Sequence, residues 1–100
     1  MSRGPGRTQR QALEVLEREA RSMDAVEVAC SALGRTITGS EASSYRRALR
    51  SLARRGIVAD LGRSYRFGRR HYATLDVAAE MQERYRATFG EPWSVARPLP

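Results

Sequence analysis

Residues 43–58 have the sequence Ser-Ser-Tyr-Arg-Arg-Ala-Leu-Arg-Ser-Leu-Ala-Arg-Arg-Gly-Ile-Val. Tyr45, Leu49 and Leu52 are spaced four and three residues apart, so they share one face of a helix. The rest of the helix surface carries the arginines at positions 46, 47, 50, 54 and 55. Gly56 predicts the helix end, because glycine readily takes the left-handed backbone conformation found there. A helix that buries one side and presents guanidinium groups on the other suits a phosphate-rich duplex.

A first helix is predicted well upstream of this stretch. Thr8 followed by Gln11 forms a capping-box pattern, in which two side chains bond the free amides at a helix start. The helix is expected to run from Thr8 to about Arg21 or Ser22. Its apolar inner face consists of Ala12, Leu13, Leu16 and Ala20. Residues 1–7 before it are expected to form a flexible basic arm.

The second helix has the clearest start in the sequence. Asp24 and Glu27 form a capping box, and Met23 and Val28 are placed for the hydrophobic staple that often accompanies one. Gly34 predicts the end of this helix. Its buried stripe consists of Val28, Ala29, Ala32 and Leu33.

The third helix, which contains the opening stretch, begins upstream of Ser43. Thr38 with Glu41 forms a third capping box, and Ser40 is a competing cap. The helix is expected to extend to about Arg55. Residues 35–37 are expected to be extended. The whole connection at residues 35–40 is longer than a tight helix-turn-helix turn, so it either holds a short strand or alters how the third helix is presented.

A change of composition follows the third helix. Residues 57–75 are rich in Val, Ile, Tyr, Phe and Thr and are interrupted by Gly62 and Gly68, which predicts a β-hairpin. Two registers fit this segment. One places the turn at residues 62–64, and the other places it near residues 67–69.

The C-terminal segment 76–90 is predicted to be a helix that ends at Gly90, and residues 91–100 an irregular tail. An apolar stripe repeats every four residues at Val77, Met81, Tyr85 and Phe89. The stripe fits two roles: packing on the first helix to complete the monomer core, or pairing with a second subunit as the face of a homodimer. Trp93 in the tail is placed to cover part of it.

Three capped helices, a glycine stop and a basic hairpin, in this order, resemble the winged helix-turn-helix domain of bacterial DNA-binding regulators. The matching residues, 48–58, are Ala-Leu-Arg-Ser-Leu-Ala-Arg-Arg-Gly-Ile-Val. The residues at 4–13, Gly-Pro-Gly-Arg-Thr-Gln-Arg-Gln-Ala-Leu, are similar to the starts of small actinobacterial proteins of this type. The resemblance implies a mainly α protein with a small β-hairpin (α+β), with the winged domain at 8–75 followed by a C-terminal helix.

Positive charge is concentrated in one half of the chain. The formal net charge is +7, and all 18 basic residues are arginine. Residues 46–71 contain nine arginines and a single acidic residue, Asp60, whereas residues 8–33 contain three arginines and five acidic residues. The absence of lysine indicates GC-rich codon usage, which explains the choice of arginine but not its clustering. Such a two-sided charge distribution is typical of nucleic-acid-binding proteins.

The resemblance also implies which residues contact a ligand. On the third helix, the DNA-facing residues are Ser43, Ser44, Arg46, Arg47 and Arg50. On the wing, the residues for backbone or minor-groove contacts are Arg63, Arg66, Arg69 and Arg70. Arg47 is expected to pair with guanine. The implied function is sequence-specific binding of double-stranded DNA by a cytoplasmic, nucleoid-associated transcriptional regulator or plasmid or phage control protein.

Two other functions stay open. A winged helix can serve as a protein-interaction subunit of a nucleoprotein complex, although the clustered charge argues against this. An RNA-binding module is favoured if Tyr65 and Phe67, which alternate with the wing arginines, are exposed for base stacking.

Several functions are not expected. The chain has one histidine, no glycine-rich phosphate loop and no paired-carboxylate motif, which argues against an enzyme. His71 has no carboxylate cluster near it in the sequence, so neither a metal nor a cofactor is expected. The single cysteine, Cys30, excludes an internal disulfide and is expected to be a small buried apolar residue. No apolar run approaches the length of a membrane span.

Overall fold

The computed structural model describes residues 6–63 and 68–90. Predictions for the arm through residue 5, for residues 64–67 (Tyr65, Arg66 and Phe67 among them) and for the tail with Trp93 lie outside the described residues. The described chain is a mixed α+β fold, as expected. Its elements are α1 (Arg7–Glu19), β1 (Met23–Asp24), α2 (Ala25–Leu33), α3 (Gly39–Arg54), β2 (Val58–Arg63), β3 (Arg70–Thr74) and α4 (Leu75–Phe89).

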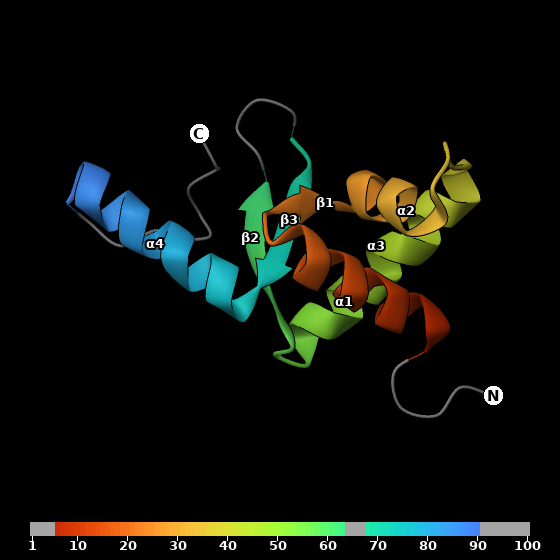
Figure 1. The fold of residues 1–100 in the computed structure, drawn as a ribbon, viewed down its shortest axis with the longest axis horizontal. Coiled ribbons are helices and arrows are strands. Elements are labelled where there is room, and N and C mark those ends of the chain that lie inside the picture. Colours follow the sequence, from red (N-terminus) through yellow and green to blue (C-terminus); the bar gives the residue numbers. More distant parts are fainter. Residues whose placement is uncertain (1–5, 64–67, 91–100) are drawn as a thin grey trace.

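The elements surround a small antiparallel sheet with the strand order β1-β3-β2. Helices α1, α2 and α3 pack against one another on one side of the molecule, and α4 extends away from the sheet on the other (Figure 1). This element order is compatible with a winged-helix layout.

Helix α1 starts differently from the prediction. It begins at Arg7 with Gly6 as its N-cap residue, and no side chain caps it. Thr8 therefore lies inside the helix, and the expected capping box with Gln11 is wrong. Gln11 faces α3 instead, where its Oε1 accepts a hydrogen bond from the Tyr45 hydroxyl at 2.9 Å. A long-range hydrogen bond has replaced the local one.

Helix α1 also ends earlier than expected. The last helical residue is Glu19, because Ala20 takes a left-handed conformation with φ of 53° and donates its amide to the Leu16 carbonyl. Ala20 is exposed rather than part of the inner face, and Val15 is buried in its place. An alanine gave no sequence signal for this conformation, which glycine or asparagine usually occupies.

The two other predicted capping boxes are confirmed. In α2 the Asp24 carboxylate accepts from the Glu27 amide at 2.9 Å, and Glu27 accepts from the Asp24 amide at 3.0 Å. In α3 the same exchange joins Thr38 and Glu41. The competing cap at Ser40 is wrong, since this residue lies within α3.

The short strand lies in a different connection from the one predicted. The connection at residues 35–37 contains no strand, whereas Met23 and Asp24 form β1 and pair with Tyr72 and His71 of β3. The N-cap geometry explains this position: Asp24 must be extended to cap α2, with φ −85° and ψ 171°, and an extended backbone can also pair as a strand.

The hairpin register excludes one of the two expected turns. Val58 pairs with Thr74, and Arg63 pairs with Arg70, so the turn lies between Arg63 and Arg70 and not at 62–64. A β-bulge interrupts the ladder between Asp60 and Arg63. Gly62 occupies the bulge with φ of 81°, and its amide donates to the Asp60 carboxylate at 2.9 Å.

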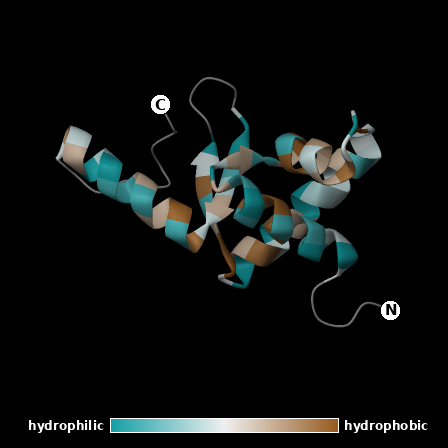
Figure 2. Ribbon diagram, viewed as in Figure 1, coloured by the Kyte–Doolittle hydropathy of each residue, from teal (hydrophilic) through white to brown (hydrophobic). Residues whose placement is uncertain are grey.

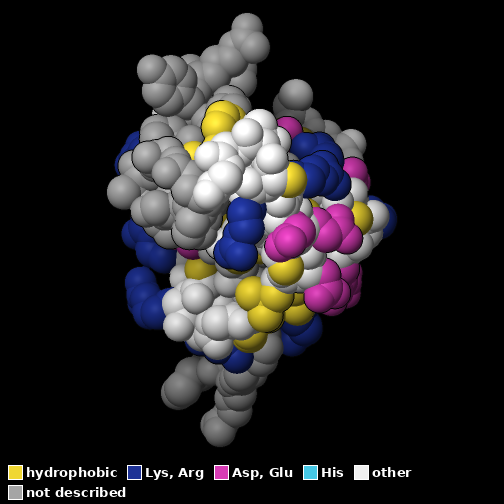
Figure 3. Space-filling view, turned by 90° about the vertical axis from the view of Figure 1, so that its left-hand side faces the viewer, with side chains coloured by type: hydrophobic (Ala, Val, Ile, Leu, Met, Phe, Trp, Pro, Cys, Tyr) yellow, Lys and Arg dark blue, Asp and Glu magenta, His cyan; other side chains and the backbone are white. Residues whose placement is uncertain are grey.

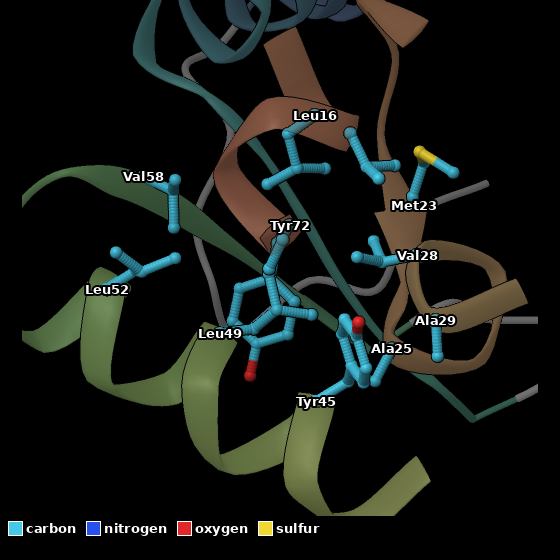
Figure 4. Packing of buried hydrophobic residues seen from close by; sticks show 12 residues of the cluster. Leu16, Met23, Ala25, Val28, Ala29, Tyr45, Leu49, Leu52, Val58 and Tyr72 are labelled. Atoms are coloured by element: carbon cyan, nitrogen blue, oxygen red, sulfur yellow. The ribbon is translucent and has the colours of Figure 1, made fainter. Parts of the chain in front are cut away.

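One hydrophobic cluster joins α1, α2 and α3 to the sheet. The predicted face of α3 is confirmed, because Tyr45, Leu49 and Leu52 are all buried. Figure 4 shows Leu49 and Leu52 pointing from α3 toward Tyr72 and Val58 of the hairpin. In Figure 2 the hydrophobic segments concentrate where these helices meet the strands, and α4 is largely hydrophilic beyond its first turns.

Helix α4 does not pack on α1, which corrects one of the two roles expected for its stripe. Its contacts are with β2 and β3, where Val77 and Met81 pack on a second small cluster formed by Leu61, Ala73 and Ala78. The position follows from Thr74, the last residue of β3, which also caps α4 through a hydrogen bond from the Val77 amide. Beyond this cluster, the stripe continues as the ring pair Tyr85–Phe89, with Phe89 55% exposed.

Candidate nucleic-acid interface

The exposed surface of α3 carries most of the predicted contact residues. At about 100° of rotation per residue, a single arc of about 100° contains Ser43, Arg46, Arg47, Arg50 and Arg54. Arg46, Arg47 and Arg50 are exposed, and Ser43 is half-buried. Ser44 lies about 60° beyond Arg47 and does not share this arc. Arg55 faces α1, where it donates to the Gln9 side chain at 2.9 Å.

The arginines of the hairpin differ in how firmly they are held. Arg70 donates twice to the Asp60 carboxylate, at 2.9 and 3.0 Å. Arg69 is exposed and makes one longer contact of 3.5 Å with Asp24. Arg63 donates to the Gly68 carbonyl at 3.0 Å. Both Arg70 bonds come from one nitrogen, Nη1, which reaches both carboxylate oxygens. This charge-assisted contact holds Arg70, whereas Arg69 keeps more freedom to turn toward a ligand. The remaining predicted wing residue, Arg66, lies outside the described residues.

The two sets of arginines meet at one cavity of about 310 Å³. Its arginine lining comes from α3 and from the hairpin and consists of Arg46, Arg50, Arg63, Arg69 and Arg70. The first residues of α2, Ala25 and Val26, complete the wall together with Asp24 and Tyr72. We refer to this feature as the arginine cavity. Of the predicted contact residues, the structure brings these five together, and Arg47 lies outside the cavity on the adjoining surface of α3.

Much of the positive charge at the arginine cavity is not neutralised. Within residues 6–63 and 68–90, neither Arg46 nor Arg50 has a carboxylate at ion-pair distance, and the same holds for Arg63. Only Asp24 and Asp60 pair with cavity arginines. Five guanidiniums thus face two carboxylates, which leaves an excess of three positive charges.

Tyr72 forms the floor of the cavity and adds no negative charge to it. Burial raises the pKa of its hydroxyl, and the Asp60 carboxylate raises it further, whereas Arg70 and Arg50 oppose the shift. The hydroxyl therefore stays protonated at neutral pH. Tyr72 was missed as a core residue, and the burial of the adjacent Ala73 shows that β3 has no simple alternation of buried and exposed residues that could have indicated it.

His71 has carboxylate neighbours that its sequence position did not indicate. Strand pairing sets His71 opposite Asp24, and the ligand atoms of Asp24, Glu27 and His71 lie within 4.8 Å of one another. This corrects the expectation of an isolated histidine. Both carboxylates already hold the amides of the capping box, and Arg69 and Arg21 also contact them. The cluster is therefore satisfied by the protein itself.

The acidic side chains gather on a different part of the surface. Figure 3 shows Asp and Glu side chains collected on one side of the view, with several arginines along the opposite margin. Other arginines are paired with acidic residues, as in Arg35–Glu41 at 2.6 Å and Arg21–Glu27 at 3.3 Å. Among the described residues of α3 and the hairpin, Arg46, Arg47, Arg50, Arg54 and Arg63 have no ion pair.

Asp24 provides a test of how the cavity wall is built. We expect Asp24→Ala to lower the free energy of unfolding by about 1 kcal/mol, because the N-cap of α2 is lost. Asp24→Asn should cost much less, since asparagine caps a helix nearly as well as aspartate, and the contact with the 60%-exposed Arg69 adds little. Urea unfolding measures both variants. Equal losses of unfolding free energy in the two variants would show that the carboxylate charge, and not the N-cap hydrogen bond, stabilises the start of α2.

Glu41 predicts an acid-sensitive start of α3. The pKa of Glu41 is lowered from 4.5 to about 2, first by the hydrogen bond from Arg35 and next by that from the Thr38 amide. A lowered pKa stabilises the fold above pH 4.5, and this contribution is lost as the pH falls from about 4.5 to about 2. We expect the thermal midpoint of wild type to fall across this window more steeply than that of Glu41→Gln. Parallel curves for the two proteins would contradict the assignment.

The remaining residues considered for chemistry stay apart from the arginine cavity. Cys30 is half-buried on α2 rather than fully buried. Among the described helices, none combines the length and the apolar character needed to cross a bilayer.

Comparison with models of protein families, with curated proteins and with solved structures gives no match for this chain. Within the described residues, the arginine cavity and the adjoining surface of α3 are the features that bear most directly on function.

Proposed function

We propose that this protein binds double-stranded DNA sequence-specifically, as a winged helix-turn-helix regulator of bacterial transcription or of a plasmid or phage. Helix α3 would enter the major groove, and the β2–β3 hairpin would act as the wing on the flanking backbone. The observation that supports this most strongly is the arginine cavity, which guanidiniums of α3 and of the hairpin line together. Three of the five, Arg46, Arg50 and Arg63, have no carboxylate partner among the described residues. A contiguous cationic surface of this kind fits the phosphates on either side of a groove.

The proposal assigns different roles to two parts of the surface. Arg47 adjoins the cavity on the exposed arc of α3 and has no carboxylate partner among the described residues. It is the residue for guanine recognition, where a bidentate guanidinium contact discriminates between bases. Arg69 of the hairpin contacts phosphate. The protein would act in the cytoplasm at the nucleoid and needs no cofactor for this function.

If Arg47 recognises a base and Arg69 contacts phosphate, replacing each residue should weaken DNA binding in a different way. Arg47→Ala should weaken binding to selected sites by about 1–3 kcal/mol and affect random DNA less. Arg69→Ala should weaken both by similar factors and reduce the slope of log affinity against log salt by about one. Fluorescence anisotropy with a selected site and a random GC-rich duplex measures both. Equal losses of specificity from the two variants would contradict this division between base and phosphate contacts.

The same titration separates the proposal from its alternatives. No binding to any duplex at low salt would favour a winged-helix protein-interaction subunit. Preference for single-stranded RNA over duplex DNA would favour an RNA-binding module. A homodimer through the Val77, Met81, Tyr85 and Phe89 stripe stays a prediction, since Val77 and Met81 also pack within the monomer.

A further inference from the structure

The arginine cavity has the composition of a site for a single phosphate group. Arg46 and Arg50 enter it from successive turns of α3, while Arg69 enters from the hairpin. Guanidiniums bind phosphate oxygens through pairs of parallel hydrogen bonds, which makes two or three of them a strong phosphate ligand set. The other two cavity arginines have defined partners, Asp60 for Arg70 and the Gly68 carbonyl for Arg63. Arg50 has a hydrogen bond to the neutral Tyr72 hydroxyl, and Arg69 has one contact of 3.5 Å with Asp24. Arg46, Arg50 and Arg69 thus keep the most donors available for an anion.

The wall opposite α3 also favours a negative charge. Ala25 and Val26 are the first residues of α2, whose first-turn amides have no acceptor within the helix. The capping box uses the amides of Asp24 and Glu27 and not those of Ala25 and Val26, two residues that line the cavity. These amides add the positive end of the helix dipole to the three arginines.

The size of the cavity limits what it can hold. A volume of about 310 Å³ lies at the lower end of the range for small-molecule sites. It suits a phosphate group with the first atoms of its ester bonds. The buried ring of Tyr72 offers no exposed face on which a base could stack.

We propose that the arginine cavity binds one phosphate group through Arg46, Arg50 and Arg69, and that in the DNA complex a backbone phosphodiester beside the groove supplies this group. The identity of the phosphate source rests on the proposed function, whereas the anion site stands on the cavity alone. On binding, Arg69 exchanges its single 3.5 Å contact with Asp24 for the phosphate. The bound phosphate fixes the height and tilt at which α3 enters the groove.

Inorganic diphosphate is the probe for the anion site. It is added to the full chain at constant ionic strength, with sodium chloride as the reference salt, and binding is followed by amide chemical shifts and by the thermal midpoint. We expect shifts at Ala25, Val26 and Arg69 and a rise in the midpoint. Arg46→Gln and Arg50→Gln should each weaken diphosphate binding by about tenfold, the loss of one charge-assisted contact.

The matched control is Arg54→Gln, which removes an exposed arginine from the same arc of α3 but does not line the cavity. It should bind diphosphate as the wild type does. The substituted side chains are exposed, so the variants are expected to fold. Melting curves recorded without diphosphate verify this. Equal weakening by all three substitutions, or effects matched by sodium chloride, would overturn the site.

Competition with a fluorescent duplex separates the two proposals. Displacement of DNA by diphosphate beyond the effect of ionic strength supports a shared phosphate position. Duplex binding without specific diphosphate binding overturns the anion site and leaves the proposed function standing. Diphosphate binding without duplex binding overturns DNA as the phosphate source and leaves the anion site standing.

Discussion

Replacing Arg46 and Arg50 together by glutamine is expected to lower affinity for duplex DNA by about 100-fold at moderate salt. Both side chains line the arginine cavity and lack carboxylate partners within the described chain, so their charge is available to phosphates. Each phosphate contact contributes about 0.9 to the salt slope, and because both side chains are proposed to hold the same phosphate, the slope should fall by about one. Anisotropy titrations at several salt concentrations measure both quantities.

A matched double variant separates position from net charge. Arg84→Gln with Arg86→Gln removes the same two charges from α4, whose contacts are with β2 and β3 rather than with α3. Only general electrostatic attraction is reduced, which is screened over distances of about 8–10 Å at moderate salt. We expect a loss of about threefold or less for this control. Similar losses in the two double variants would mean that DNA responds to total charge and not to the α3–hairpin surface.

The largest expected effect on stability comes from Leu49→Ala. Leu49 is 0% exposed and lies in the cluster that joins α1, α2 and α3 to the sheet. Truncation of a buried leucine costs about 3–5 kcal/mol when neighbouring elements cannot close the cavity. Domains of this size have about 5–15 kcal/mol in total, so this single change removes a large fraction. The urea midpoint should fall accordingly.

Leu75→Ala is the corresponding control, since the same atoms are removed from a side chain that is 54% exposed. Its cost should stay below about 1 kcal/mol. A Leu49→Ala protein with near wild-type stability would show that the main cluster is not the centre of the fold. Both variants are compared at equal protein concentration, so that any self-association affects them alike.

Features that depend on neighbouring residues could be predicted from the sequence. The capping boxes of α2 and α3 were predictable because their partners lie three residues apart, as Asp24 and Glu27 do. The buried face of α3 was also predictable from the periodicity of its apolar residues. The start of α1 was not, because Gln11 bonds Tyr45, which is far away in the chain.

Features that depend on pairing between distant segments could not be predicted. The carboxylate neighbours of His71 follow from the pairing of β1 with β3, and the two-residue strand β1 has no local signal of its own. The partner of α4 depends on where β3 ends, since Thr74 serves both elements. For the candidate site, the arginines were predictable as a set, whereas the cavity that joins five of them required the tertiary arrangement.

The bulge in β2 has a consequence for the direction of Arg63. Along an uninterrupted strand, side chains alternate between the two faces, so Arg63 would share the face of Ala59 and Leu61, which pack toward α4. The additional residue at the bulge reverses this alternation, so the side chain of Arg63 lies on the other face of the sheet. Arg63 therefore pairs with Arg70, on the face that Tyr72 presents to the three-helix core. The bulge at Gly62 thus moves one cation from the α4 side of the sheet to the side where Arg46 and Arg50 of α3 line the arginine cavity.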